Sequence, residues 1–157
     1  MRPYPEEVLC AIQSGVAAHL APEVKSSYGQ AQFAFSMLLF TIVQRDYDTA
    51  VPDLVDANAA LRGLLDSARA SLAGIDRDDA RAANEAIAAL PPPVPSLRLS
   101  ALRSENEALR AILCRLTPVI EPAADDAALA LMRPVRDAIY AHLSADAKRR
   151  IFPILSA

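Results

Sequence analysis

Apolar residues recur at helical spacing from the start of the chain. The first stripe consists of Val8, Leu9, Ile12, Val16 and Leu20. It follows Pro5 and two glutamates, and this combination is typical of a helix start, because proline fits the first turn and acidic residues favour the positive end of the helix dipole. Steps of three and four residues place the stripe on one face. The pattern therefore predicts a helix from Pro5 to the turn at Pro22.

The segment AQFAFSMLLFTIVQRDYD, residues 31–48, carries apolar side chains in almost every direction around a helix. A helix that is apolar all round is normally buried all round. The pattern predicts a second helix from about residue 23 to residue 49. Its larger side chains form two opposite sets, of which one is Phe33, Met37 and Phe40 and the other is Phe35, Leu39 and Ile42.

Two later segments repeat apolar residues in alternating steps of three and four, which is a heptad seam. We expect one such helix from Pro52 to about residue 75 and another from Ser96 to about residue 118. Each seam has one polar member, Asn58 in the first and Asn106 in the second. A polar residue at a seam position costs stability but fixes register. The two asparagines are expected at similar depth in two parallel helices, where they could hydrogen-bond each other; alternatively, each points outward.

The remaining segments complete an all-helical pattern. A short helix is expected over residues 77–90, followed by PPPVP at 91–95, where consecutive prolines favour an extended polyproline-like chain. A last long helix is expected over residues 125–143, with a kink at Pro134. The fold class is therefore all-α, an up-and-down helical bundle of about five to six helices. We predict a single domain over residues 1–157, with an extended Pro-rich connector at 91–95.

The composition supports this fold class and suggests a core. Ala, Leu, Arg and Glu are the best helix formers and are frequent here, whereas aromatic residues, which favour strands, make up only 5% of the chain. The core is expected to contain the apolar members of the stripes, namely Leu9, Ile12, Val16, Phe33, Met37, Phe40, Leu54, Leu61, Leu65, Leu102, Leu109, Leu113, Leu116 and Ile139.

The charge and the apolar runs exclude some functions and favour one location. The net charge is −3, which argues against general nucleic-acid binding, because such binding needs a basic surface. The longest charge-free apolar stretch is broken by polar residues and is shorter than the ~20 residues of a membrane span. The N-terminal residues do not follow the signal-peptide pattern. We therefore expect a cytoplasmic protein whose two thiols, Cys10 and Cys114, are reduced and packed among apolar neighbours.

Residues suited to catalysis are scarce. The only histidines are His19 and His142, and there is no Glu-x-x-His motif, nucleophile elbow or Gly-rich phosphate loop. We therefore expect no metal and no cofactor, and a non-catalytic protein rather than an enzyme. An alternative is a small-ligand-binding protein or enzyme with a pocket near Tyr28, Gln32 and His142, because the small and amide residues of YGQAQ lead directly into the apolar helix.

The second helix raises the question of what covers it. Its neighbours contribute one apolar stripe each, and soluble proteins rarely expose apolar patches beyond a few hundred Å². A closed two-fold dimer is the commonest way to bury such a surface. We therefore predict a self-associating accessory or interaction protein, most simply a homodimer. Phe35, Leu39 and Ile42 are assigned to the dimer interface and Phe33, Met37 and Phe40 to the core, although the reverse assignment is also open.

The segments RPYPEEVLCAIQ and AQFAFSMLLFTIVQRD resemble the opening of a family of small, all-helical, uncharacterised bacterial proteins. Members of that family begin with a Pro-Tyr-Pro-Glu-Glu-Leu-type start and continue with a Phe-rich helix that ends in Arg-Glu or Arg-Asp. They are typically encoded beside aminoglycoside-phosphotransferase-like and acyl-CoA-dehydrogenase-like enzymes. The resemblance implies an accessory role with such an enzyme as a partner, and it implies no catalytic residues.

Overall fold

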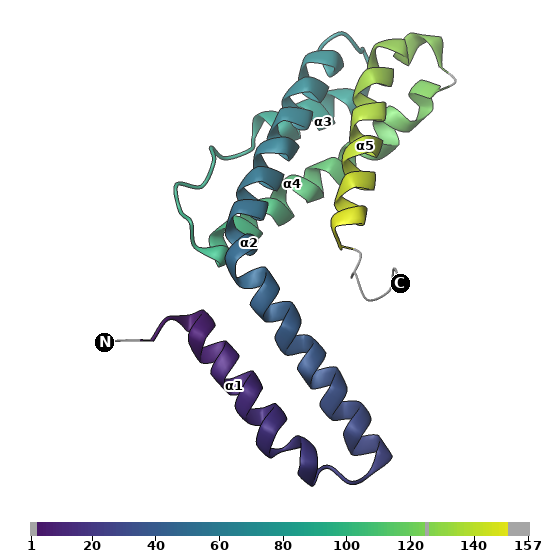
Figure 1. Cartoon of the computed structure of the whole chain (residues 1–157). Helices are drawn as coiled ribbons and strands as arrows, with labels where there is room; N and C mark the ends of the chain where they lie inside the picture. The colour runs from purple at the N-terminus through teal and green to yellow at the C-terminus, as the bar shows by residue number, and fades with distance from the viewer. Residues whose placement is uncertain (1–2, 125, 151–157) are drawn as a thin grey trace. The chain divides into compact units, whose positions relative to one another are not determined.

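The computed structural model describes residues 3–124 and 126–150 and is helical throughout its regular elements (Figure 1). Its helices are α1 (Pro5–His19), α2 (Ser27–Leu72), α3 (Asp78–Ala88), α4 (Leu99–Ile120) and α5 (Arg133–Arg150). Short 3-10 helices lie at Ala21–Glu23, Glu121–Ala124 and Ala127–Met132. Among the described residues there is no β-strand. The all-α prediction is confirmed.

Helix α2 is one continuous element of 46 residues, where the sequence suggested two helices separated near Pro52. Pro52 lies inside it rather than at a helix start, so that boundary was wrong. Proline cannot donate a hydrogen bond to the carbonyl four residues earlier, which here is that of Asp48. Because Asp48 is exposed, water can reach the carbonyl, and the helix continues through the gap in its hydrogen bonding.

The chain divides into two compact units, Met1–Asp53 and Leu54–Ala157, which we call unit 1 and unit 2. The boundary falls inside α2, so this helix contributes its first half to unit 1 and its second half to unit 2. The single domain predicted for residues 1–157 did not anticipate this division. The sequence does mark the place of this boundary, because the first heptad seam begins close to it.

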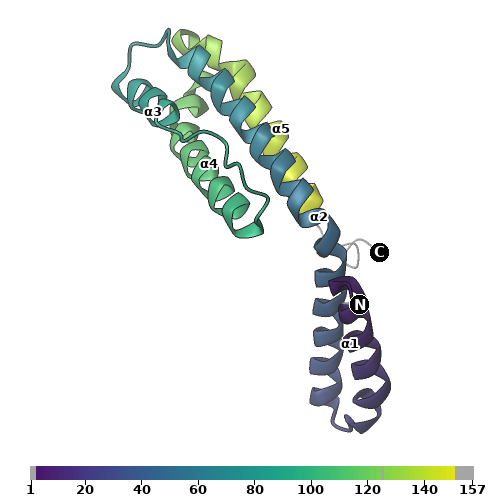
Figure 2. The same ribbon diagram turned by 90° about the vertical axis from the view of Figure 1, so that its left-hand side faces the viewer.

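Unit 2 contains the hydrophobic core. Figures 1 and 2 show α4 running in the same direction as the second half of α2, while α5 runs back. Seven predicted core residues are buried, which confirms them: Leu61, Leu65, Leu102, Leu109, Leu113, Leu116 and Ile139. Ala68, Leu72, Ile87, Ile120 and Met132 join them. Leu54 is only half-buried because it lies where unit 2 begins, so its assignment to the core was wrong.

Two proline-containing segments of unit 2 behave differently from each other. The connector, including residues 91–95, is outside any helix, as expected from its prolines. Pro134 does not kink the last helix; it occupies the first turn of α5, after two 3-10 helices that fill most of residues 121–132. Proline fits a first turn, because the N–H it lacks has no helical partner there. The kink prediction was therefore wrong, and Pro134 is part of a helix start.

Unit 1 is an antiparallel pair of helices formed by α1 and the first half of α2, joined by a tight turn at residues 20–26 (Figures 1 and 2). Gly29 is needed close to this turn, because a Cβ there would lie 2.7 Å from Val24 Cγ1 and 2.9 Å from Ser26 Oγ. The Ser26 hydroxyl accepts a hydrogen bond from the Gly29 N–H at 3.0 Å. The small residue therefore serves the turn that reverses the chain.

No residue of unit 1 is buried over the described positions 3–53. Ile12 is 45% exposed. The other five core residues predicted here are half-buried: Leu9, Val16, Phe33, Met37 and Phe40. Their assignment to a closed core of the single chain was wrong, because two helices can cover each other along only one line of contact.

Candidate interaction surface

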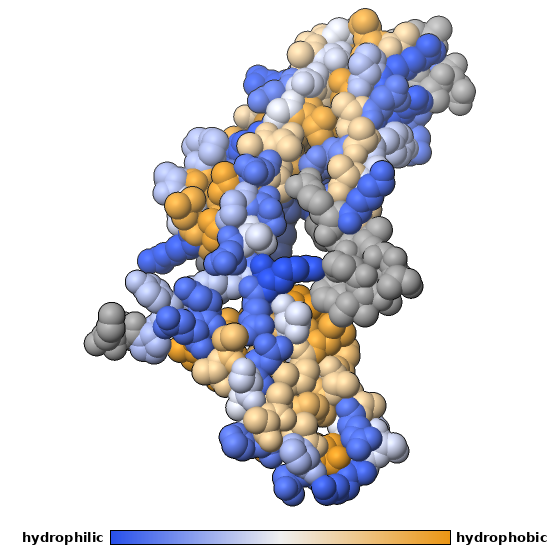
Figure 3. All heavy atoms as spheres, viewed as in Figure 1, coloured by the Kyte–Doolittle hydropathy of each residue, from blue (hydrophilic) through white to orange (hydrophobic). Residues whose placement is uncertain are grey.

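Unit 1 exposes a collection of large apolar side chains (Figure 3). The residues concerned are Val8, Ile12, Leu20, Tyr28, Phe35, Leu39, Val43 and Tyr47. All but Leu20, which directly follows α1, lie on α1 or on the unit 1 half of α2, and no described residue of unit 1 is buried. Scattered exposed apolar residues are normal on a protein surface, but a group of this size on one helix pair is typical of an interaction site.

One side of α2 is turned toward α1. The Gln13 side-chain amide donates to Thr41 Oγ1 at 3.2 Å, which joins the two helices. Met37 lies one turn before Thr41 and therefore shares its side of α2. Phe35 and Leu39 lie on the opposite side, where they are 57% and 46% exposed. The set that contains Met37 thus faces the other helix of unit 1, and the set that contains Phe35 faces away.

The exposed side of α2 carries apolar residues without formal charge. From Ser26 to Gln44 there is no Asp, Glu, Lys or Arg. The first charged residues along the helix are Arg45 and Asp46, whose side chains pair with each other at 2.8 Å. Ile42, predicted at the same interface as Phe35 and Leu39, is half-buried. A surface of this kind can bury area against a partner, but it offers no charge pattern for recognising one.

The three residues predicted to line a ligand pocket belong to different units. Tyr28 and Gln32 are exposed, one turn apart near the start of α2 in unit 1, and Tyr28 is 74% exposed. His142 is half-buried on α5 in unit 2. The pockets beside the connector, described next, include none of the three. The ligand-binding hypothesis stays a prediction.

A buried polar cluster lies in unit 2, between α2 and α4. The Asn106 amide donates to Asn58 Oδ1 at 2.8 Å, so the two seam asparagines are in contact. Asn58, only 4% exposed, also donates to the Leu102 carbonyl at 3.0 Å. Beside them, the Arg62 guanidinium bonds Glu105 Oε1 through Nε at 2.8 Å and through Nη2 at 2.6 Å. The sequence did not predict that the Arg62–Glu105 ion pair lies beside Asn58.

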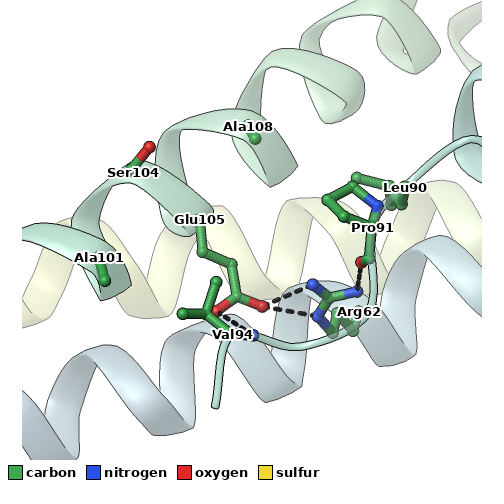
Figure 4. Close-up of a pocket in the computed structure, with 8 residues that line it drawn as sticks. All are labelled: Arg62, Leu90, Pro91, Val94, Ala101, Ser104, Glu105 and Ala108. Carbon is green, nitrogen blue, oxygen red and sulfur yellow. Dashed lines mark hydrogen bonds and ion pairs between the residues drawn. The ribbon is translucent and has the colours of Figure 1, made fainter. Parts of the chain in front are cut away.

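The same cluster fixes the Pro-rich connector. Arg62 Nη1 donates to the Pro91 carbonyl at 3.0 Å, and Glu105 Oε2 accepts the Val94 N–H at 3.4 Å. Figure 4 shows both side chains reaching the connector. They line a pocket of about 310 Å³ whose other lining residues are mainly apolar. A second pocket of about 280 Å³ shares Arg62, Val94 and Glu105. The cluster therefore attaches a segment without helical hydrogen bonds to the core.

Arg62 and Glu105 show structural rather than catalytic features. Glu105 is almost enclosed, with 6% of its side chain exposed, and its partner Arg62 has 18% exposed. The Arg62 guanidinium and both Glu105 carboxylate oxygens are bonded to other groups of the same unit. A sequence signal did exist, because Glu105 immediately precedes the seam residue Asn106. However, charged residues beside a seam are ordinarily solvated, so the pattern did not single them out.

Two further polar contacts of unit 2 lie at the surface. The Tyr140 hydroxyl donates to Glu121 Oε1 at 3.1 Å, and this bond to a carboxylate raises the pKa of the Tyr140 phenol above its ordinary value. The hydrogen bond from Arg77 lowers the pKa of Asp79. Cys10 and Cys114 are both exposed, so the expectation that they pack among apolar neighbours was wrong. Each lies on the outer side of its helix.

Within the part of the chain that the structure describes, no three His, Cys, Asp or Glu side chains are grouped so that they could hold a metal ion. No described helix is both long and apolar enough to cross a membrane. Comparison of the chain with protein-family models, with curated proteins and with solved structures finds no match. The apolar surface of unit 1 is thus the feature on which a function can be argued.

Proposed function

We propose that this protein is a non-catalytic interaction protein that self-associates through the apolar surface of unit 1. The observation that carries the proposal is the contrast between the two units. Unit 2 has a buried core of its own, whereas over residues 3–53 no described residue is buried and side chains as large as Phe35 and Leu39 are exposed.

The free energy of folding favours a partner for unit 1. A single hydrophobic core is hard to build below about 70–80 residues, and unit 1 has fewer. Isolated helices are marginal in water, and most helical stability in proteins comes from packing an apolar face. Two helices that pack only on each other leave the outer side of α2 in water. A second surface laid against that side supplies the missing burial.

A second copy of the chain is the simplest partner. Every copy brings the same apolar surface, and closed two-fold dimers are the commonest soluble oligomers. The absence of charged residues between Ser26 and Gln44 leaves no charge pattern by which a different protein would be selected. The resemblance of the N-terminal segments adds a role beside an acyl-CoA-dehydrogenase-like or phosphotransferase-like enzyme, which would bind the assembled protein elsewhere.

Sedimentation and light scattering at micromolar concentration test the proposal. The chain has a mass of 16.8 kDa, and the expected species is a dimer of about 34 kDa. Leu39→Glu should shift the protein to the monomer, because it places a charge in the apolar contact. The control is Leu131→Glu, which changes an exposed leucine of unit 2, 68% exposed against 46% for Leu39, and should leave the dimer intact. A soluble monomer of the unmodified chain would refute self-association.

A further inference from the structure

The exposed side of α2 has a regular pattern that extends beyond Phe35 and Leu39. Six residues follow one another in alternating steps of four and three: Tyr28, Gln32, Phe35, Leu39, Ile42 and Asp46. We call this set the α2 seam. Four of its members, Tyr28, Gln32, Phe35 and Leu39, are exposed, and Ile42 and Asp46 are half-buried. Steps of four and three are the spacing by which one helix packs along another.

Resting on the proposed self-association, we infer that two copies pack the α2 seam against itself in antiparallel orientation. In this arrangement Phe35 lies against the partner's Leu39, and Gln32 lies against the partner's Ile42. At each end, Tyr28 lies against the partner's Asp46. The same three pairs recur on both sides of a two-fold axis that passes near the level of Met37.

The single charged residue of the seam, Asp46, determines the orientation. In a parallel pair, each residue would meet its own counterpart, and Asp46 would lie beside the partner's Asp46, which like-charge repulsion disfavours. In the antiparallel pair, the Tyr28 hydroxyl can donate to the Asp46 carboxylate of the partner subunit. Arg45 already bonds Oδ1 of Asp46, and a carboxylate has further acceptor positions. Antiparallel packing therefore pairs each polar end with a complementary group.

The limits of the seam also fit a second copy. It begins one residue after the start of α2 at Ser27, and its next two positions, Thr49 and Asp53, are polar and exposed. The seam is about 27 Å long, from 18 residue steps at 1.5 Å each. In the antiparallel pair, the helix start of one copy falls where the apolar seam of the other ends. The polar positions beyond Asp46 therefore limit the proposed contact to this length of α2.

Disulfide trapping tests the orientation. In a background with Cys10→Ser and Cys114→Ser, we would prepare two single-cysteine proteins, Tyr28→Cys and Asp46→Cys. After subunit exchange and mild oxidation, the mixture should give a covalent heterodimer, whereas neither protein alone should give a covalent homodimer. Tyr28 and the partner's Tyr28 would be about 27 Å apart along the axis, far beyond the reach of a disulfide.

A matched control uses the side of α2 that is turned toward α1. Gln30→Cys and Gln44→Cys have the same mean position along the helix as the first pair but lie near Thr41 on the other side. Their mixture should give no covalent dimer. Light scattering of each reduced protein shows whether the copies associate at all, so failure of the orientation is separated from failure of the proposed function.

Three outcomes would overturn the inference. Covalent homodimers of each single variant, without the heterodimer, would establish a parallel pair and leave self-association standing. A dimeric protein with cross-links only in the control pair, or in neither pair, would place the interface away from the α2 seam. A monomeric background protein would refute this inference together with the proposed function.

Discussion

Asn106 donates its side-chain amide to Oδ1 of Asn58 at 2.8 Å, joining two residues that lie 48 positions apart in the chain. The bond links α2 to α4, whose seams otherwise consist mainly of leucines. A single polar pair in an apolar seam fixes the register of the two helices, because any shift along the axis would leave both amides without partners. The pair is thus an alignment device for the core of unit 2.

The two asparagines should differ in their contribution to stability. Asn58→Ala should lower the free energy of unfolding by about 1–3 kcal/mol, because it removes the buried side-chain bond to the Leu102 carbonyl and leaves the half-buried Asn106 amide without its partner. Asn106→Ala should cost less, since Asn58 keeps its bond to Leu102. Urea unfolding followed by circular dichroism measures both. Equal losses of unfolding free energy in the two variants would show that the bond between the two amides accounts for the whole contribution of each asparagine.

Glu105→Ala should be among the most destabilising changes in unit 2. Removing one member of a buried ion pair typically costs about 3–5 kcal/mol, and the lower end applies here because Arg62 is 18% exposed. The variant also removes the acceptor of the Val94 N–H, so limited proteolysis should cut the connector sooner. Arg81→Ala is the control, because its pairs with Asp76 and Asp78 are exposed and such pairs contribute about 0–1 kcal/mol.

Core and surface leucines should respond differently to truncation. Leu109 is fully buried and Leu61 is 2% exposed, so replacing either by Ala should cost about 2–5 kcal/mol through lost burial and a cavity. Leu39→Ala in unit 1 should cost far less when measured on the monomer, because Leu39 is 46% exposed. Thermal unfolding at low and high protein concentration separates the two effects. A large loss for Leu39→Ala in the monomer would mean that the chain covers this residue itself.

The hydrogen bond between Tyr140 and Glu121 should be visible in an alkaline titration. The carboxylate stabilises the protonated phenol and repels the phenolate, so the Tyr140 pKa is raised. Glu121→Gln keeps the shape but removes the charge, and Tyr140 should then ionise at lower pH. Phenolate absorbance follows the titration, and Tyr140→Phe in each background identifies the transition. An unchanged curve in the Glu121→Gln protein would contradict the contact.

Sequence periodicity predicted unit 2 well and unit 1 poorly, for a physical reason. In unit 2, Leu61, Leu65, Leu109 and Leu113 are seam residues that pack against other helices of the same unit. The spacing therefore corresponds directly to burial. In unit 1 the same kind of spacing identifies apolar faces, but it does not say which chain covers them.

Two other features escaped prediction because local rules do not determine them. Proline lies in a helix start at Pro134 but within a continuous helix at Pro52, and the residue type alone does not distinguish the two cases. The partnership of Arg62 with Glu105 joins residues 43 positions apart beside the seams rather than in them. Periodicity describes apolar faces, and it is silent on buried charge pairs of this kind.

The absence of buried residues from the described part of unit 1 implies an order of events when the protein is exposed to deuterated solvent. Amides of α4, held by the core of unit 2, should exchange only through cooperative opening, whereas those of α1 should exchange through local fraying. The single helix α2 should then show a gradient, fast before residue 53 and slow after it. Raising the protein concentration should slow amide exchange at the α2 seam. The protection of the first half of α2 then measures the fraction of the protein that is dimeric.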